Sequence, residues 1–561
     1  MSFLYFILLI GVLIFFHELG HFLAAKLFGV KVLKFALGFG KKLVSFQKGE
    51  TEYAINLFPL GGYVKMLGQE PAELRTEEPL PPEDLPRAFD SKPRWQRAIV
   101  MLAGPTFNLA LPLPLFFLLF SLVGELPPAT VGSVMPDGPA WRAGIQPGDR
   151  IVEIDGEPIR YWEEMEARVS EAPGRELRLK IARDAELLEL RITPQPTPRP
   201  HRLAALSKTV GLIGVTQAFL GSQVGVGDPE GIAGVAGLRS WDLVVAAGGQ
   251  PVTRWVELQQ AFARHAGQPL ELTVRRTETV TALPPDPAAR ATLGEAHQFT
   301  VLVPPAGTPE SVGLWPGELV VHQVEPEGAA AKAGLQPGDV LLEVDGKRCV
   351  TFELCLRPFR EAYEQAHAVR FLRPGERTGP RVVSFAPQIR KELNEVKQEE
   401  VHAAIGFANR PFFVVADLVP NEDRLLRASV RAVTEGWNMI WLNAVGLAAL
   451  ATCQISAKNV GGPIMIFDLA GQAAKRGWED FVWLLAIISI NLGLINLLPI
   501  PILDGGQIVV LGVETLKRGP LSLRSRMIVA YVGLAMVVFL MVFAFKNDIE
   551  RYWDDLVGFF R

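Results

Sequence analysis

The sequence predicts a polytopic α-helical membrane protein with four transmembrane helices, a membrane-dipping β-sheet and tandem extracytoplasmic α+β domains. Three observations support this fold class: apolar spans gather at the two ends of the chain, the middle repeats, and ionisable residues lie inside the first span. The chain has 561 residues, enough for several domains. Its mean hydropathy of +0.22 is high for a soluble protein. The net charge of -4 gives no indication of a nucleic-acid partner.

The first span, residues 1–30, contains the pentad His17-Glu18-Leu19-Gly20-His21 between nearly all-apolar flanks. Histidines four positions apart lie on one face of a helix, where both can bind one Zn²⁺, and Glu18 can act as general base toward a zinc-bound water. Ionisable groups are costly inside a bilayer and indicate a functional site. A signal peptide is the alternative, but residues 1–4 carry no Lys or Arg.

Residues 31–97 are predicted to form a membrane-dipping β region on the cytoplasmic side. The segment 32–64 alternates glycines with β-forming residues and contains Gly38, Gly40, Gly61 and Gly62, so it cannot continue the first helix. We expect a sheet whose edge accepts substrate as an added strand. A surface hairpin that never touches substrate is the alternative.

Further apolar spans are predicted at residues 98–124, 481–506 and 526–546, each near the ~20 apolar residues that a bilayer core requires. Lys and Arg are concentrated in residues 26–48, 87–97 and 517–526. Basic loops favour the cytoplasm, which places both termini and the long middle region on the extracytoplasmic side. Pro112 and Pro114 should kink the second span.

Residues 400–480 are predicted to be an outer-face linker with interfacial helices. One apolar segment in it, from Trp437 to Cys453, competes for a membrane span. Counting this segment as a span would invert all that follows and place the last basic loop outside. It also contains Asn438 and Asn443. We therefore interpret it as a helix docked on the outer face of the membrane.

Three similar segments occupy the middle of the chain, at residues 127–196, 209–280 and 310–390. In each, an Ala-Gly pair, an Asp and a final Gly keep the same offsets. The pattern predicts a short helix ended by Gly, a Pro-Gly turn, a buried strand and a tight Asp-Gly turn. It resembles the PDZ domain, which binds an extended peptide as an added strand. The middle copy is degenerate, since it lacks Pro-Gly before Asp242, and could instead be a spacer.

Residues 195–208 and 281–309 are rich in Pro or small residues and are expected to be linkers or loops. The chain contains only three cysteines, which excludes a disulfide framework. Cys349 and Cys355 either pair in an oxidising compartment or stay free, because their spacing does not decide between these alternatives.

A catalytic zinc needs a third protein ligand, and Asp504 is the candidate. Counted from their outer ends at about 1.5 Å per residue, His17, His21 and Asp504 reach similar depths near the cytoplasmic side. Pro499 and Pro501 should break the helix there and free backbone groups for a polar cavity. A helix stop followed by a turn is the alternative, but the matched depth favours a ligand.

With these motifs identified, the chain resembles a bacterial site-2 protease of the regulator of sigma-E protease group. The family motifs are His-Glu-x-x-His and Asn-x-x-Pro-x-Pro-x-Leu-Asp-Gly, which here begin at His17 and Asn496. Similar stretches also lie at residues 38–40, 59–66, 103–108, 461–464 and at Asn491. Familiar members carry two PDZ domains, whereas this chain has three PDZ-like copies. The difference puts substrate gating in doubt, not the chemistry.

The resemblance implies a zinc metalloendopeptidase with Glu18 as the catalytic base and His17, His21 and Asp504 as zinc ligands. Either Asn491 or Asn496 would help to stabilise the oxyanion. The further residues expected to bind or support substrate are Asn491, Asn496, Pro499, Pro501, Gly38, Gly40, Gly61, Gly62 and Asn108.

The implied substrates are single-pass membrane proteins, such as anti-sigma factors or remnant signal peptides, that a site-1 protease has first shortened outside the membrane. The PDZ-like domains would filter substrates by size or bind the trimmed end. The implied location is the bacterial inner membrane, with the active site toward the cytoplasm.

Two other function classes remain: a non-catalytic membrane scaffold that binds peptides through its PDZ-like repeats, and a zinc-dependent transporter. A structural zinc site is closed by four protein ligands and has no need of Glu18. A transporter would explain neither Glu18 nor the repeats.

Overall fold

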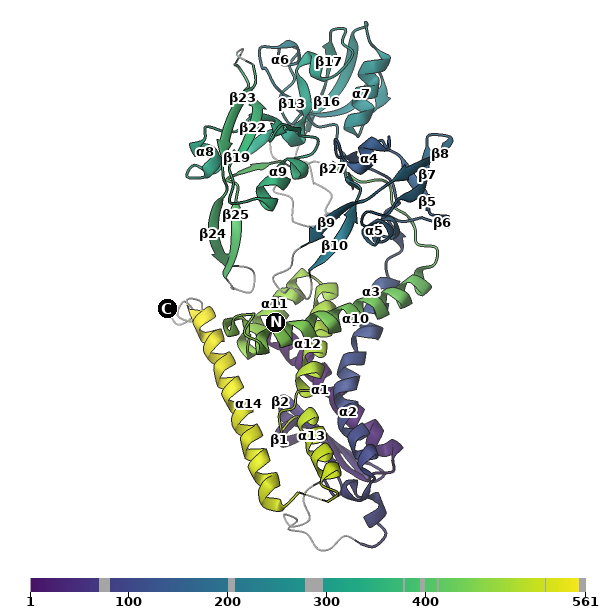
Figure 1. The fold of residues 1–561 in the computed structure, drawn as a ribbon, viewed down its shortest axis with the longest axis vertical. Helices are drawn as coiled ribbons and strands as arrows, with labels where there is room; N and C mark the ends of the chain where they lie inside the picture. The colour runs from purple at the N-terminus through teal and green to yellow at the C-terminus, as the bar shows by residue number, and fades with distance from the viewer. Residues whose placement is uncertain are drawn as a thin grey trace.

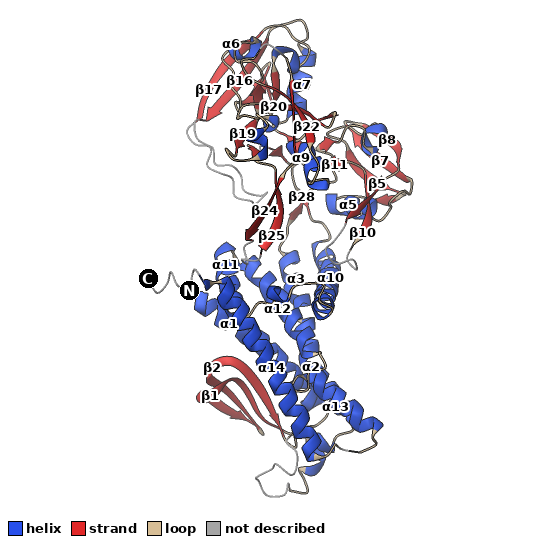
Figure 2. Ribbon diagram, turned by 60° about the vertical axis from the view of Figure 1, so that its left-hand side comes forward, coloured by secondary structure: helices blue, strands red, loops and turns tan. Residues whose placement is uncertain are grey.

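The computed structural model consists of a layer of apolar helices and three repeated α+β domains (Figure 1). It describes residues 2–69, 81–199, 207–277, 296–376, 379–393, 399–410, 413–519 and 521–553. Within these residues, four helices are long and apolar enough to cross a membrane: Ser2–Leu27, Arg94–Ser121, Trp478–Asn496 and Arg524–Arg551. These helices fit the predicted polytopic membrane protein. Figure 2 shows the helices gathered below the strand-rich domains.

The second span is interrupted, because α2 (Arg94–Ala110) and α3 (Pro112–Ser121) meet at Leu111. Pro112 has no N–H, so the carbonyl of Asn108 loses its hydrogen-bond partner one helical turn ahead. The hydroxyl of Ser489, on α12 (Trp478–Asn496), donates to this carbonyl at 2.7 Å. The predicted interruption at Pro112 thus frees a carbonyl group that forms a hydrogen bond between the second and third spans.

The predicted third span, residues 481–506, is not one helix. α12 ends at Asn496, a turn containing Pro499 and Pro501 follows, and Asp504 begins a separate helix, α13 (Asp504–Leu516). The two prolines cannot donate backbone hydrogen bonds, so the helix cannot continue through them. Asp504 therefore lies at the start of a new helix and not within the third span.

The last helix, α14 (Leu523–Arg551), is attached to the other helices near both of its ends. At one end Arg526 forms an ion pair with Glu514 at 2.6 Å. At the other end the buried carboxylate of Asp548 accepts backbone N–H groups of Gly462, Ile464 and Met465 at 2.9–3.1 Å. Asp548 thereby caps α11 (Pro463–Arg476), which also packs against α1 (Ser2–Leu27).

The apolar segment that competed for a span lies in α10 (Arg424–Ala451), which is not among the four membrane-length apolar helices of the described residues. Figure 1 shows α10 lying crosswise to α2 and α14. Its buried small residues, such as Ala432 and Gly436, pack against α3, where Gly436 approaches Leu113. Exposed apolar residues form a stripe on α10: Leu426, Val430, Val433, Trp437 and Trp441. The arrangement fits a docked helix, which stays a prediction.

The region after α1 folds as two long paired strands, β1 (Val32–Lys48) and β2 (Thr51–Met66). Both strands bend, so residues 34–37 pair with residues 52–55 on one side and with residues 62–65 on the other. The result is a sheet in which residues 62–66 form one edge and residues 42–48 the other. Gly38 and Gly40 adopt φ of 81° and 87° near the bend, a conformation that favours glycine.

The middle of the chain contains three domains with the same element order. The first comprises β4 (Ser133–Val134), α4 (Pro139–Arg142), β5 (Arg150–Ile154), β6 (Glu157–Pro158), α5 (Trp162–Ser170), β7 (Leu177–Arg183), β8 (Glu186–Ile192) and β11 (Val215–Thr216). The second comprises β13 (Val224–Val226), α6 (Ile232–Val235), β14 (Leu243–Ala247), β15 (Gln250–Pro251), α7 (Trp255–Arg264), β16 (Leu270–Thr277), β17 (Ala296–Val303) and β18 (Leu314–Pro316). The third comprises β19 (Val321–Val324), α8 (Ala329–Lys332), β20 (Val340–Val344), β21 (Lys347–Arg348), α9 (Phe352–Glu361), β22 (His367–Leu372), β23 (Arg381–Phe385) and β26 (Phe407–Asn409).

The sheets of the three domains also match. Each domain has a four-stranded antiparallel sheet, in the orders β6-β5-β7-β8, β15-β14-β16-β17 and β21-β20-β22-β23. Each closes with a strand that pairs with the first strand of the same domain, as β11·β4, β18·β13 and β26·β19. The middle copy, described as degenerate from its sequence, therefore contains the same set of elements as the other two.

One buried ion pair recurs in all three domains. The carboxylates of Asp149, Asp242 and Asp339 are buried, and each is bound by an Arg located 34 residues later. The same Arg donates to the carbonyl of a glycine that ends the short helix, Gly144, Gly237 or Gly334. The pair ties the last turn of the short helix to the sheet in each copy.

The domains extend past the predicted ends at residues 196, 280 and 390. The closing strands β11, β18 and β26 come late, after hairpins or loops that carry no repeat signature. The linker interpretation is corrected in part, because β17 lies within residues 281–309 and β9 (Gln195–Arg199) pairs with β10 (Lys208–Leu212). Prolines are tolerated in β9 because it has a partner on one side only. Residues 200–206 and 281–295 lie outside the described part of these segments.

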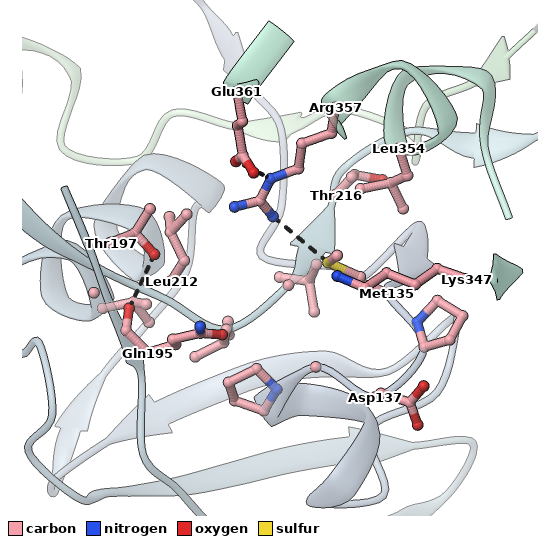
Figure 3. Close-up of a pocket in the computed structure, with 18 of the residues that line it drawn as sticks. Met135, Asp137, Gln195, Thr197, Leu212, Thr216, Lys347, Leu354, Arg357 and Glu361 are labelled. Atoms are coloured by element: carbon pink, nitrogen blue, oxygen red, sulfur yellow. Dashed lines mark hydrogen bonds and ion pairs between the residues drawn. The ribbon is translucent and has the colours of Figure 1, made fainter. Parts of the chain in front are cut away.

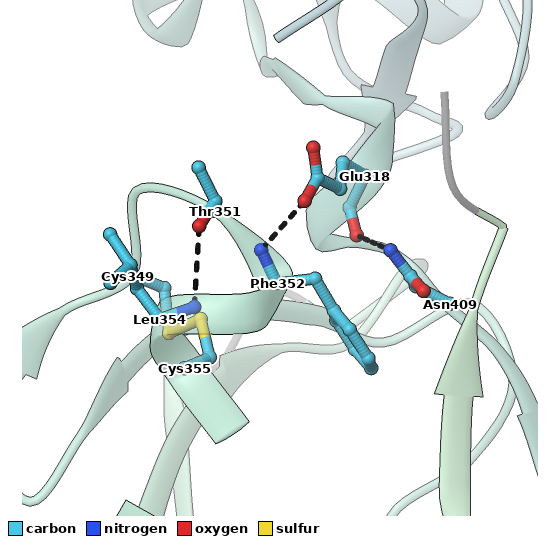
Figure 4. Close-up of a disulfide and its surroundings, with 7 residues drawn as sticks. All are labelled: Glu318, Cys349, Thr351, Phe352, Leu354, Cys355 and Asn409. Atoms are coloured by element: carbon cyan, nitrogen blue, oxygen red, sulfur yellow. Dashed lines mark hydrogen bonds between the residues drawn. A yellow bond between two sulfur atoms is a disulfide. The ribbon is translucent and has the colours of Figure 1, made fainter. Parts of the chain in front are cut away.

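Cys349 and Cys355 are joined by a disulfide at the start of α9, with Cα atoms 5.3 Å apart (Figure 4). Thr351 caps this helix by accepting the N–H of Leu354 at 3.2 Å. Glu318 accepts the N–H of Phe352 at 2.9 Å and so also binds the first turn of α9. The pairing that the sequence left open is present, and it fixes the start of the helix.

Paired segments connect the repeats to the membrane helices and to one another. β3 (Glu125–Leu126), which leaves the second span, pairs with β28 (Val419–Pro420), which leads into α10. β12 (Phe219–Leu220) and β27 (Phe413–Val414) pair across the repeats, and β24 (Gln388–Leu393) pairs with β25 (Glu399–Ala404). Arg427 of α10 binds Glu163 and Glu164 of α5, so the first domain rests directly on α10.

Candidate metal centre

Close packing of α1 against α2 positions the histidines of the pentad. A side chain at Gly20 would place its first carbon 2.3 Å from the carbonyl oxygen of Ala103. A side chain at Gly104 would lie 2.3 Å from Nε2 of His21. Both positions therefore require glycine, and the resulting approach brings His17 and His21 against the buried face of α2.

The structure brings His17, His21 and Asp504 together, as the matched depths predicted. The Nε2 atoms of the two histidines are 3.3 Å apart. The carboxylate of Asp504 places Oδ2 3.3 Å from Nε2 of His17 and Oδ1 3.5 Å from Nε2 of His21. Within the described residues these three form a group that could hold a metal ion.

The donor atoms fit zinc. In a tetrahedral site with bonds of about 2.0–2.1 Å, neighbouring donor atoms are separated by about 3.3–3.4 Å. The three separations in the structure, 3.3–3.5 Å, are close to this value. Two imidazoles and one carboxylate are a donor set that catalytic zinc uses, and three protein ligands leave a fourth position open.

Hydrogen bonds on the far side of each ring fix the histidines. Nδ1 of His21 lies 2.7 Å from the carbonyl oxygen of Val100, so this nitrogen carries the proton and Nε2 is left free for a metal. Nδ1 of His17 faces the amide groups of Asn108 at 3.2 Å and of Asn496 at 3.5 Å. Neither the carbonyl of Val100 nor the hydroxyl of Ser489 could be identified from the sequence, because contacts to backbone atoms leave no residue pattern.

The turn before α13 fixes Asp504. A side chain at Gly505 would lie 2.2 Å from the carbonyl oxygen of Leu497, and one at Gly506 would lie 2.0 Å from that of Ile500. Asp504 is followed by glycines because the start of α13 packs directly on the preceding turn. Pro501 of this turn also approaches Gly533 of α14.

Glu18 lies between the metal ligands on α1 and faces the edge of the sheet. A side chain at Gly62 would place its first carbon 2.6 Å from Cγ2 of Ile14 and 3.1 Å from Cγ of Glu18. Gly62 thus allows the edge strand of residues 62–66 to contact α1 beside Glu18. Gly61, with φ of 123°, precedes it at the bend.

The remaining predicted residues are divided between the centre and its surroundings. Asn108 and Asn496 contact His17, whereas among the described residues Asn491 forms no hydrogen bond with His17, His21 or Asp504. Gly38 and Gly40 lie within the sheet, and Gly38 packs against the carbonyl of Phe58. Pro499 and Pro501 lie in the turn that separates α12 from α13.

A second candidate site is a cavity of about 430 Å³ between the first and third repeated domains (Figure 3). Its floor comes from α5 and from residues 211–216 of the first domain, and its roof from α9 and β21 of the third. Arg357 of the roof binds Glu361 and contacts the sulfur of Met135 at 3.6 Å. Both domains line the cavity with apolar and charged side chains, such as Met165 and Glu166 of the first domain and Leu354 and Lys347 of the third.

Two histidines and a carboxylate around a zinc-sized space, beside a glutamate, are the arrangement that zinc-dependent hydrolases use. The chain belongs to peptidase family M50, the site-2 protease family, whose sequence profile matches residues 5–540. Zinc is therefore its cofactor.

Curated relatives match over nearly the whole chain. A protein of Xylella fastidiosa (strain 9a5c) named "Putative zinc metalloprotease" is 30% identical, with 96% of each chain covered. RSc1411 of Ralstonia nicotianae, with the same description, is 28% identical, with 97% of each chain covered. The regulator of sigma-E protease RseP of Escherichia coli (strain K12) is 29% identical over 97% of this chain and 98% of its own.

Proposed function

We propose that this chain is an intramembrane zinc metalloendopeptidase that cleaves transmembrane segments of single-pass proteins. One observation carries the proposal: the three zinc-spaced donor atoms and Glu18 lie inside a helix layer long and apolar enough to cross a membrane. A site at this depth reaches substrates that are themselves embedded in the bilayer.

His17, His21 and Asp504 would hold the zinc ion through Nε2, Nε2 and the carboxylate. When bound there, zinc acts as a Lewis acid that polarises the scissile carbonyl and acidifies water. Glu18 is the catalytic base in this proposal: it takes a proton from the attacking water and later delivers it to the leaving amine. Asn496, on the last turn of α12, lies beside His17, and its amide is the better-placed candidate for stabilising the oxyanion.

Substrate would bind as an added strand along residues 62–66. A transmembrane helix shields its carbonyls by internal hydrogen bonds, so it must be unwound before cleavage. The edge strand contacts α1 beside Glu18 at Gly62, and an edge strand has unpaired backbone groups for a partner. We therefore propose that the substrate binds at the edge of residues 62–66, which lies beside Glu18, and not at the opposite edge of residues 42–48.

The three repeated domains are PDZ-like in this proposal and act outside the membrane. Within the described residues, the closing strand of each domain pairs only with the first strand, which leaves an edge for an extended peptide. They would exclude large ectodomains or bind the end of a substrate already cut by a site-1 protease, such as an anti-sigma factor; remnant signal peptides would also be short enough. The cavity of Figure 3 is the candidate peptide site.

The proposed location is the bacterial inner membrane, with both termini and the repeats outside. Ser2 packs against Gly471 of α11, and Asp548 caps the same helix, so the start of α1 and the end of α14 lie on the side of the helices that faces the repeats (Figure 1). The basic loops lie at the other end of the helices, where Lys31 binds Asp84 and Arg526 binds Glu514. His17 and His21, in the C-terminal half of α1, are nearer to this basic end.

A non-catalytic scaffold is not favoured. A structural zinc site would be closed by a fourth protein ligand, and the described residues offer three. A scaffold also has no need of Glu18.

The proposal is tested by cleavage in detergent of a single-pass substrate whose ectodomain has been shortened. Glu18→Gln should keep near-stoichiometric zinc and lose cleavage, because the amide cannot take the proton. His17→Ala should lose both zinc and cleavage. Cleavage by the Glu18→Gln protein at the wild-type rate would refute the assigned base. Trapping with the same variant, followed by mass spectrometry, identifies natural substrates.

A further inference from the structure

The ring of His17 faces an unusual pair of neighbours on its far side. Its Nδ1 atom lies 3.2 Å from Nδ2 of Asn108 and 3.5 Å from Nδ2 of Asn496. Asn108 is fully buried. Its Oδ1 atom has no hydrogen-bond partner among the described residues, although a buried amide oxygen without a partner is costly.

Zinc coordination through Nε2 would determine whether Nδ1 of His17 must face a hydrogen-bond donor or an acceptor. A histidine that binds a metal through Nε2 is neutral and carries its proton on Nδ1, which must then donate a hydrogen bond. Two N–H groups cannot satisfy each other. The oxygen and nitrogen of an asparagine amide exchange places by a half turn of the group, with no change of shape. That half turn brings the unpartnered Oδ1 of Asn108 to the proton of His17.

We propose that Asn108 is a positioning residue whose amide oxygen accepts the Nδ1–H of His17 and so fixes the ring for zinc. The proposal rests on the proposed coordination of zinc by His17. Asn108 touches neither substrate nor metal, and it acts through the histidine.

Contacts of α2 with α12 and α1 fix the backbone around Asn108 and so position its side chain beside His17. Because Pro112 has no N–H, the carbonyl of Asn108 is free of its helix, and Ser489 of α12 binds it at 2.7 Å. One turn earlier on α2, Gly104 packs directly on His21. The helices thus pair His21 with Gly104 and His17 with Asn108, one turn apart on each.

The two histidines then receive equivalent partners from the same helix. His21 donates to the carbonyl of Val100 on α2, and His17 donates to the amide of Asn108, also on α2. Asn496 lies farther from Nδ1 and belongs to the end of α12. Its amide is therefore available for a contact other than the support of His17.

The proposal is tested by zinc retention in the full-length protein purified in detergent. Asn108→Leu keeps the size of the side chain and removes the acceptor. Because partners of metal-binding histidines contribute roughly 10–100-fold to metal affinity, chelator competition should show a loss of this size. Asn108→Asp restores an acceptor oxygen and should hold zinc close to the wild-type level. In Co²⁺-substituted protein, the visible spectrum should change in Asn108→Leu and be restored in Asn108→Asp.

Asn496→Leu is the matched control, because it removes the other amide beside His17 and should leave zinc affinity unchanged. Wild-type affinity in Asn108→Leu, or a loss in Asn496→Leu alone, would overturn the proposal. An equal loss in Asn108→Leu and Asn108→Asp would also overturn it, since a packing role is not rescued by an acceptor. His17→Ala distinguishes the proposed coordination from the proposed role of Asn108. If His17→Ala keeps zinc, the coordination by His17 is wrong. If His17→Ala loses zinc while Asn108→Leu keeps it, only the role of Asn108 is wrong.

Discussion

At this centre, residues that allow close packing matter as much as the residues that carry the proposed chemistry. The proposed zinc-binding motif can be recognised in the sequence because two histidines and a glutamate are conspicuous in an apolar helix. The residues that hold the motif in place are not conspicuous: Gly104 and Gly62 are defined only by what a side chain there would strike. The sequence shows Gly62 only as one of the glycines among β-forming residues. In the structure it is the point where the sheet edge contacts α1.

Gly62 offers a test of the edge-strand proposal at the scale of one residue. Gly62→Val would place carbon atoms within 2.6 Å of Ile14 and 3.1 Å of Glu18, so the edge strand must move away from α1. We expect cleavage to fall by at least tenfold, about 1.4 kcal/mol in the barrier, while zinc content stays at the wild-type level. Gly49→Asn, in the open turn of the same hairpin, is the control for expression and folding, since no atom lies within 4 Å of its added carbon and Asn tolerates the positive φ of this turn. Normal cleavage by Gly62→Val would argue against binding at this edge.

Glu318 predicts a pH dependence in the third repeated domain. Burial raises the pKa of Glu318 to about 7 from its usual 4.5, while the N–H of Phe352 opposes the shift. Between pH 4.5 and 7 the folded state holds more protons than the unfolded state, so stability falls as pH rises through this window and levels off above it. The full effect is up to roughly 3 kcal/mol.

The measurement is hydrogen exchange of the amides in α9 from pH 5 to pH 8, expressed as protection factors. Protection should fall with rising pH in the wild type and stay nearly flat in Glu318→Gln, which cannot ionise. Glu361→Gln, which changes an exposed glutamate at the end of the same helix, should keep the wild-type profile. A flat profile in the wild type would contradict the raised pKa.

At the scale of elements, periodicity and repetition predicted most of the architecture. The four spans follow from runs of apolar residues, and the short helix, turn and buried strand of each repeat follow from the Ala-Gly and Asp-Gly signatures. The closing strands were missed because they are two to three residues long and follow hairpins or loops. The split of the third span was only half anticipated, since prolines predict where a helix stops but not that Asp504 starts another.

The recurring ion pair shows that the middle repeat is built like its neighbours, and this can be tested. Arg276→Met leaves the buried carboxylate of Asp242 without its cation, which should cost roughly 2–4 kcal/mol. Limited proteolysis should then cut the second domain first, at unchanged zinc content. Arg275→Met, one position away on the same strand, has no such partner in the described structure and should resist proteolysis like the wild type. Equal resistance of the two variants would show that the pair does not hold the domain together.

For the whole molecule, the proposed function requires the repeats and the basic loops to lie on opposite sides of the membrane. Labelling of the native Cys453 can test this topology. Cys453 is free and exposed just after α10, and the neighbouring segment accepts hydrogen bonds from Asn547 at the end of α14. Gly519 lies just before the other end of α14, with open space around it. A helix of 28 residues spans about 42 Å, so the two positions should lie on opposite faces of the membrane.

In spheroplasts, a membrane-impermeant maleimide should label Cys453 without permeabilisation, because the basic loops favour the cytoplasm and α10 belongs to the opposite side. In a Cys453→Ser background, Gly519→Cys should be labelled only after permeabilisation. Mass spectrometry of the labelled peptide separates Cys453 from Cys349 and Cys355, which are protected by their disulfide. Labelling of both positions from outside would show that α14 does not cross the membrane. The reverse pattern would place the repeats in the cytoplasm and remove their proposed role in admitting substrates that have been cut outside.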